Sequence, residues 1–154
     1  MKSNIFIFTT LIFACALTAP KAEAQGYPNC YNVQGIQVGY YPEPSVNDIA
    51  IATTAPNGAP VVLWNPGIVN AMHPATIEFF YYHECAHHAL GHPLGNYGPG
   101  GEAIADCWAK KQMIGLGVLT QQKYGIIRQQ LMQFSKPGMD WPNGQVRVSY
   151  LDNC

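Results

Sequence analysis

The sequence has few charged side chains and no run of basic ones. Aspartate, glutamate, lysine and arginine make up 11% of its 154 residues, and the formal net charge is −1. A chain without a basic patch has no electrostatic means of attracting nucleic acid or an anionic membrane. We therefore expect neither of them as a partner of the mature protein.

Internal repeats and low-complexity tracts are also missing from the sequence. After residue 24, no apolar run approaches the roughly 20 residues that span a bilayer. With a hydrophobic content of 48%, the chain suits a single folded domain.

The first 24 residues are set apart from the rest. Lys2 precedes an apolar stretch at 5–17, and an Ala-x-Ala pattern ends at Ala24. A positive residue, a short apolar core and a small-residue cleavage site are typical of a signal peptide. We therefore expect export, to the periplasm or the medium, and a mature domain of residues 25–154. The alternative is an uncleaved anchor or a buried helix.

The cysteine count indicates disulfides. Cys15 would leave with the signal peptide, so that four cysteines remain: Cys30, Cys85, Cys107 and Cys154. An even number in an exported chain favours two disulfides, for which three pairings exist. The alternative is that some of these cysteines stay as free buried thiols.

The pentapeptide at 83–87 has the pattern H-E-x-x-H and lies in a helix expected over residues 75–90. Residues four apart share one face of a helix, so His83 and His87 can offer ring nitrogens to one cation. Zinc binds such nitrogens, and a catalytic zinc keeps one of its four positions for water. Glu84 stands where a general base for that water is needed.

A second pair of acidic residues can complete the site. Glu102 and Asp106 lie four residues apart in a second expected helix and therefore also share a face. Glu102 can add a carboxylate to the two histidines, and Asp106 can accept a hydrogen bond from the other ring nitrogen of a ligand histidine. The alternative is that both are ordinary acids near a helix N-terminus, favoured there by the helix dipole.

The strings H-E-x-x-H-H at 83–88 and E-x-x-A-D-C at 102–107 resemble those of gluzincin metallopeptidases, and in particular small bacterial neutral zinc metallopeptidases. The resemblance covers residues 60–110. It implies a zinc-dependent peptidase that acts on a peptide or protein substrate. The roles it implies are general base for Glu84, zinc ligand for His83, His87 and Glu102, and support of a ligand for Asp106.

Two more histidines follow the motif. On a continued helix, His92 would point about 140° away from His87, at about 100° per residue, so we expect His92 in a loop or beside the substrate. His88 is turned away from the ligand face, and we expect it to form a hydrogen bond in the core. The residue that stabilises an oxyanion stays open among five candidates: Tyr97, Tyr124, Arg147, Tyr150 and His92.

Helix angles bear on the disulfide pairing. Cys85 points nearly opposite the two motif histidines, and Cys107 is turned about 120° from the two carboxylates, at about 100° per residue. The Cα atoms of a disulfide lie within about 7 Å of each other. If the two helices face each other through their ligand side chains, cysteines on their opposite faces lie too far apart to form one. A Cys85–Cys107 disulfide is therefore disfavoured, which leaves two of the three pairings. Of these we expect Cys30–Cys85, which would tie the N-terminal segment behind the motif helix, with Cys107–Cys154 holding the tail.

The expected fold is α+β, a minimal zincin-like domain. A small, partly antiparallel sheet of three or four strands packs on the H-E-x-x-H helix, and two further helices complete the core. Strands are expected within 33–41, 46–54 and 60–64, with a strand-like segment at 146–151, and helices over 75–90, 101–114 and 120–134. The resemblance places the substrate beside an edge strand, for which residues 61–64 are the candidate.

The sequence therefore predicts an exported metallopeptidase with Zn²⁺ as its cofactor, in which Glu84 takes a proton from a metal-activated water. Two alternatives stay open. One is a non-catalytic binding module stabilised by zinc, and the other is a metal-dependent amidase that acts on cell-wall material. The oligomeric state is not specified.

Overall fold

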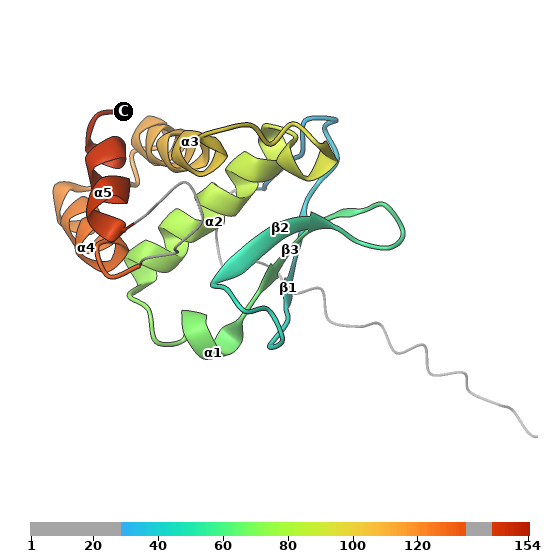
Figure 1. The fold of residues 1–154 in the computed structure, drawn as a ribbon, viewed down its shortest axis with the longest axis horizontal. Helices are drawn as coiled ribbons and strands as arrows, with labels where there is room; N and C mark the ends of the chain where they lie inside the picture. The colour runs from blue at the N-terminus through green and yellow to red at the C-terminus, as the bar shows by residue number, and fades with distance from the viewer. Residues whose placement is uncertain (1–28, 135–142) are drawn as a thin grey trace, which may run out of the picture.

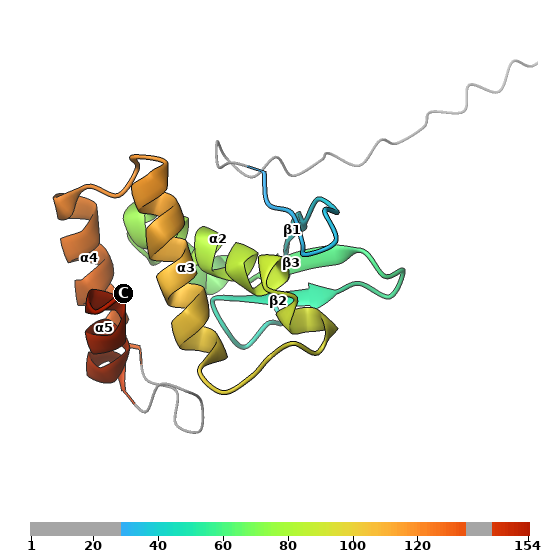
Figure 2. The same cartoon turned by 90° about the horizontal axis from the view of Figure 1, so that it is seen from above.

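The computed structural model describes residues 29–134 and 143–154, so the signal peptide expected at 1–24 lies outside the described residues. The domain is α+β, as expected. A small sheet covers one side of a central helix, and other helices gather on the opposite side (Figures 1 and 2). Among the described residues, no helix has the length and apolar character needed to cross a membrane.

The sheet consists of β1 (Gly39–Pro42), β2 (Ala50–Thr54) and β3 (Pro60–Trp64), in the order β1-β3-β2. β3 pairs in parallel with β1 and in antiparallel fashion with β2. The expectation that residues 61–64 form an edge strand is therefore wrong, because a strand with partners on both sides has no backbone groups left for a peptide. In the described part of the chain, β2 is the edge strand nearer the motif helix.

The domain is built around α2 (Pro74–Ala89), which carries the H-E-x-x-H motif. Pro74 lies in its first turn, where the missing N–H removes no hydrogen bond. His73 caps the helix, since its Nδ1 accepts a hydrogen bond from the N–H of Ala75 at 3.1 Å. Every residue from 79 to 88 is buried. The motif therefore lies inside the domain, held by neighbours on nearly all sides of the helix.

Further helices complete the main core. α3 (Gly101–Gly115) and α4 (Gln121–Leu131) both pack on α2. A short helix, α1 (Pro66–Val69), follows β3, and a 3-10 turn, η1 (His92–Leu94), follows α2. The largest fully buried apolar side chains of this core come from four helices: Phe79, Met113, Ile127, Leu131 and Leu151.

The chain ends in a helix, α5 (Gly144–Asp152), and not in the strand-like segment expected at 146–151. The β-branched residues Val146 and Val148 favour a strand locally. The buried positions instead follow helical spacing: Gly144, Arg147, Val148 and Leu151. Asn143 starts the helix, because its side-chain oxygen accepts a hydrogen bond from the N–H of Val146 at 2.9 Å.

Both expected disulfides are confirmed. Cys30–Cys85 and Cys107–Cys154 each join Cα atoms 5.7 Å apart. Cys30 and Cys85 belong to a small second core with Val38 and Val62, so this disulfide ties the N-terminal segment to the back of the motif helix. Two disulfides are typical of proteins in an oxidising, extracellular environment.

The first residue of α5 packs directly on the end of α4, which gives a test of this arrangement. A β-carbon at Gly144 would collide with the backbone carbonyls of Leu131 and Met132. Because backbone cannot swing aside, Gly144→Ala should lower the free energy of unfolding by about 1–3 kcal/mol in chemical denaturation.

Gly125→Ala within α4 is the matched control. A β-carbon at Gly125 meets nothing within 4 Å. The same substitution should therefore raise stability there, by up to about 1 kcal/mol, because alanine is the better helix former. Equal stabilities for the two variants would contradict the close contact between α4 and α5.

Candidate metal centre

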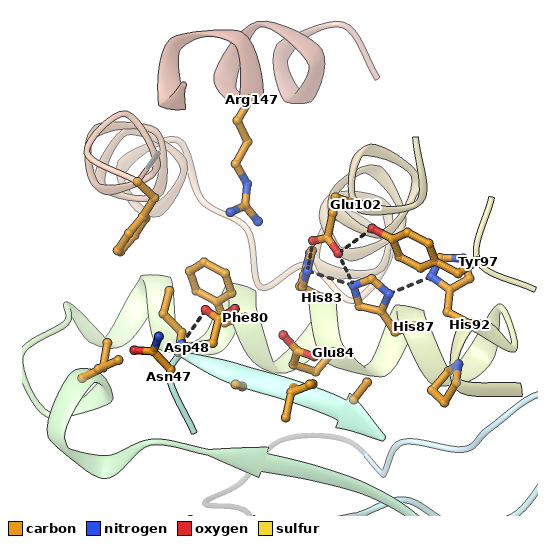
Figure 3. A pocket seen from close by; sticks show the side chains of 17 residues that line it. Asn47, Asp48, Phe80, His83, Glu84, His87, His92, Tyr97, Glu102 and Arg147 are labelled. Atoms are coloured by element: carbon orange, nitrogen blue, oxygen red, sulfur yellow. Dashed lines mark hydrogen bonds and ion pairs between the residues drawn. The ribbon is translucent and has the colours of Figure 1, made fainter. Parts of the chain in front are cut away.

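The three predicted ligands converge between α2 and α3. His83 and His87 lie one turn apart on one face of α2, and Glu102 reaches them from the first turn of α3 (Figure 3). The two histidine Nε2 atoms are 3.1 Å apart. Oε2 of Glu102 lies 3.1 Å from Nε2 of His83, and Oε1 lies 3.5 Å from Nε2 of His87. The group could hold a metal ion.

These separations fit tetrahedral coordination of a divalent ion. Zinc–ligand bonds of about 2.0–2.1 Å place neighbouring ligand atoms of a tetrahedron about 3.4 Å apart. The two ring nitrogens and the Glu102 carboxylate therefore need little movement to bind such an ion. Within the part of the chain that the structure describes, no fourth His, Cys, Asp or Glu joins the group. One coordination position would thus be left for water or a substrate.

The outer nitrogen of each histidine lies close to another polar side chain. Nδ1 of His83 lies 2.8 Å from Oδ1 of Asp106. Nδ1 of His87 lies 2.7 Å from Nδ1 of His92. A proton held at each outer nitrogen leaves the Nε2 lone pair directed at the ion, which is the arrangement typical of metal-binding histidines. The structure therefore brings Asp106 to the place that its predicted supporting role requires.

The charges around the site also suit a divalent cation. Glu84, Glu102 and Asp106 contribute three negative charges and Arg147 one positive charge, and all four side chains lie within this buried region. With both ligand histidines neutral and all three carboxylates ionised, as metal binding requires, these groups leave a charge of −2, which a divalent cation balances. Uncompensated buried charge is costly, so the cluster favours binding of a cation.

The pKa values of these side chains are set by burial and by the neighbouring charges. Burial raises the pKa of Glu84. Burial alone would lower the pKa of His83, but the neighbouring carboxylates, Asp106 first among them, together raise the pKa of His83 to about 10. Burial would raise the pKa of Glu102, but hydrogen bonds with the two histidines keep it well below its usual range. Burial therefore favours a protonated Glu84, whereas the pairing of opposite charges favours a protonated His83 and an ionised Glu102.

Glu84 lies beside the ligand group without belonging to it. Its side chain projects from α2 into the same space as His83 and His87 (Figure 3). The backbone N–H of Ala52 on β2 donates a hydrogen bond to the Glu84 carboxylate. That bond fixes the carboxylate between the edge strand and the ligands. A buried carboxylate with a raised pKa is suited to accept a proton and pass it on.

The ligand group opens into a pocket of about 540 Å³. Such a volume is typical of sites that take small molecules or part of a peptide. Residues 47–52 of β2 and its lead-in line one side, and α2 lines the other. Tyr97 and His92 lie at the metal end, whereas Phe80, Asp48 and Arg147 lie toward the opposite end (Figure 3).

The structure separates the five oxyanion candidates. Tyr124 and Tyr150 are not among the residues that line the pocket, and the hydroxyl of Tyr124 donates a hydrogen bond to Asp152 at 2.7 Å. His92 begins the 3-10 turn η1 and lines the pocket, but its Nδ1 is 2.7 Å from Nδ1 of His87. Arg147 lines the pocket and is held by Asp106.

Tyr97 is the candidate whose hydroxyl lies next to the ligands. It donates a hydrogen bond to Oε1 of Glu102 at 3.0 Å. Its ring packs over the start of α3, where a β-carbon at Gly101 would come within 2.8 Å of it. Glycine at this position therefore permits the close approach of the ring. With 46% of its surface exposed, Tyr97 is also accessible to a molecule in the pocket.

Two other contacts bear on the sequence predictions. His88 is buried, and its Nε2 lies 2.9 Å from the carbonyl oxygen of Val61, so it joins α2 to the sheet as expected. The contact of Arg147 with Asp106 was not foreseen, because 41 residues separate the two. A signal for it appears once residues 144–152 are treated as a helix, since Arg147 then falls on the buried face.

No family model, curated protein or solved structure matches this chain. The resemblance noted in the sequence therefore depends on the short strings at 83–88 and 102–107. The structure adds that these two strings, which a glycine-rich loop separates, meet through their ligand side chains.

Proposed function

We propose that this chain is an exported zinc metallopeptidase of the kind that its motif resembles. The observation that supports the proposal best is the place of Glu84, a carboxylate beside a three-residue ligand group but outside it. Structural zinc sites fill four positions with protein ligands, whereas catalytic sites use three and leave one open. A spare position with a carboxylate next to it favours hydrolysis.

Glu84 carries the proton transfers in this proposal. A bound zinc ion supplies polarisation of the scissile carbonyl and a lowered pKa for its water, about 7. Glu84 accepts the proton of the water and delivers it to the leaving amine. The raised pKa of Glu84 allows the carboxyl group to hold the proton between these two transfers. Tyr97, with its hydroxyl beside Glu102, is the residue that we assign to the oxyanion.

The substrate would lie along β2. In an antiparallel strand, the N–H and C=O of one residue point to the same side. Because the N–H of Ala52 points to Glu84, the C=O of Ala52 and both backbone groups of Ala50 also face the open edge of the sheet. An extended peptide can pair with such an edge as an added strand. β2 thus takes the role expected for residues 61–64.

A peptidase assay on the metal-loaded mature chain tests the proposal. We expect cleavage of unstructured peptides that stops on addition of a chelator and returns with zinc. Mass spectrometry of a mixed peptide pool would give the cleaved bonds, and isolated cell-wall peptides would be assayed in parallel. Stoichiometric zinc without hydrolysis of either substrate would contradict the proposal and favour a binding module. Hydrolysis of cell-wall material alone would favour the amidase.

A further inference from the structure

Arg147 forms a two-point ion pair that lies outside the proposed chemistry. Its Nε donates to Oδ2 of Asp106 at 2.8 Å, and its Nη2 donates to Oδ1 at 2.7 Å. Asp106 is 1% exposed and Arg147 is 7% exposed. The guanidinium also lies over the ring of Phe80, 5.2 Å from its centroid. A buried, bidentate pair of this kind holds both side chains in one geometry.

The same carboxylate contacts a predicted ligand. Oδ1 of Asp106 lies 2.8 Å from Nδ1 of His83 as well as 2.7 Å from Nη2 of Arg147. Burial alone would raise the pKa of Asp106, but the Arg147 guanidinium and the His83 ring together keep this pKa below its usual range. A continuous chain of contacts therefore runs from Arg147 through Asp106 to the ring whose Nε2 faces the ion.

Arg147 reaches this place because α5 is anchored to two other helices. The Cys107–Cys154 disulfide joins its end to α3, directly after Asp106 in the sequence. Nζ of Lys110 on α3 donates to the carbonyl oxygen of Leu151 at 2.7 Å. Nη2 of Arg128 on α4 donates to Oδ2 of Asp152 at 2.7 Å. These attachments leave the guanidinium of Arg147 pointing down toward α2 (Figure 3).

We propose that Arg147 is a positioning residue of the metal centre. By engaging both oxygens of Asp106, it prevents rotation of the carboxylate and so fixes the orientation of the His83 ring. The C-terminal helix would then be a working part of the metal site, and not only a cover for the core. This inference rests on metal binding by His83, His87 and Glu102, and it holds whether or not the bound ion supports hydrolysis.

The variant Arg147→Lys distinguishes the effect of the two-point hydrogen-bond geometry from the effect of the positive charge. Lysine keeps the positive charge but replaces a planar, two-point donor with a single flexible one. Changes of residues that support metal ligands typically weaken metal binding by about 10–100-fold, and we expect a loss of this size for zinc, measured by competition with a chromophoric chelator. The visible spectrum of the Co²⁺ form should change as well, because the His83 ring would sit differently.

Arg128→Lys is the matched control. Arg128 also pairs with a carboxylate of α5, but this pair is on the surface, with side chains 39% and 34% exposed. The control should keep the zinc affinity and the Co²⁺ spectrum of the wild type. Equal losses in both variants would overturn the inference, because anchoring of α5 would then explain the effect. Wild-type affinity in Arg147→Lys would overturn it too.

A double-variant cycle with Asp106→Asn covers the case in which Arg147→Lys folds poorly. Asp106→Asn should weaken zinc binding by a similar factor, and adding Arg147→Lys or Arg147→Met to it should cause little further loss. Fully additive losses would show that Arg147 acts independently of Asp106 and would overturn the inference. If the wild type itself failed to bind zinc, the metal centre and the proposed peptidase would both fail, which is distinct from loss of binding in the variants alone.

Discussion

Glu84→Gln should abolish peptide hydrolysis while the protein keeps its metal. Glutamine has nearly the shape of glutamate, and its amide oxygen can still accept the hydrogen bond from the N–H of Ala52. It cannot accept a proton at neutral pH, so the general base is lost. Because such a base typically contributes about 10²–10⁴-fold, we expect kcat/KM to fall by at least that factor. The bound metal, measured by elemental analysis, should stay at one ion per chain.

Glu78→Gln on the same helix is the matched control for this variant. Glu78 lies on α2 but forms its ion pair with Lys123, at 2.6 Å, away from the pocket-lining residues. Its substitution should leave kcat/KM near the wild-type value. Wild-type turnover in Glu84→Gln would remove Glu84 from the mechanism even if zinc binding is correct. Loss of metal in Glu84→Gln would instead make Glu84 a ligand.

The ligand set was predictable because its geometry is mostly local. A spacing of four residues within one helix fixes the relation between His83 and His87 before any tertiary contact is known. The same holds for Glu102 and Asp106 on α3. The meeting of the two pairs required one further step, a resemblance to a known motif, and the structure places the ligand atoms within 4.8 Å of one another. The same helix angles disfavoured a Cys85–Cys107 disulfide, but they did not decide between the two remaining pairings.

The errors in the prediction have tertiary causes. Residues 61–64 have the same local pattern whether they lie at the edge or the centre of a sheet, and only the parallel pairing with β1 decides it. The segment at 146–151 contains β-branched residues that favour a strand, but burial of Val148 and Leu151 against the core favours a helix. The helical form in turn brings Arg147 to Asp106. Because residues 146–151 were expected to form a strand, this contact was not predicted.

Glu102→Ala should remove metal binding and, with it, the stabilisation that the metal provides. The side chain is the one ligand from α3 in the group, and without it the two motif histidines are left as a pair on one helix. Loss of a ligand should weaken zinc binding by more than the roughly 100-fold typical of supporting residues. For the wild type, zinc at about 100 times its Kd should stabilise the fold by about 2.7 kcal/mol. The variant should show no zinc-dependent shift of Tm at that concentration.

Tyr97→Phe is the control that distinguishes a ligand from its neighbour. It removes the hydroxyl that donates to Oε1 of Glu102 but keeps the ring over Gly101 and all three ligands. This variant should keep most of the zinc-dependent shift of Tm, because the carboxylate can still bind the ion. If Glu102→Ala bound zinc as tightly as the wild type, the ion would not join α2 to α3. A site formed by His83 and His87 alone lacks the three ligands of a catalytic zinc centre, and the peptidase proposal would lose its basis.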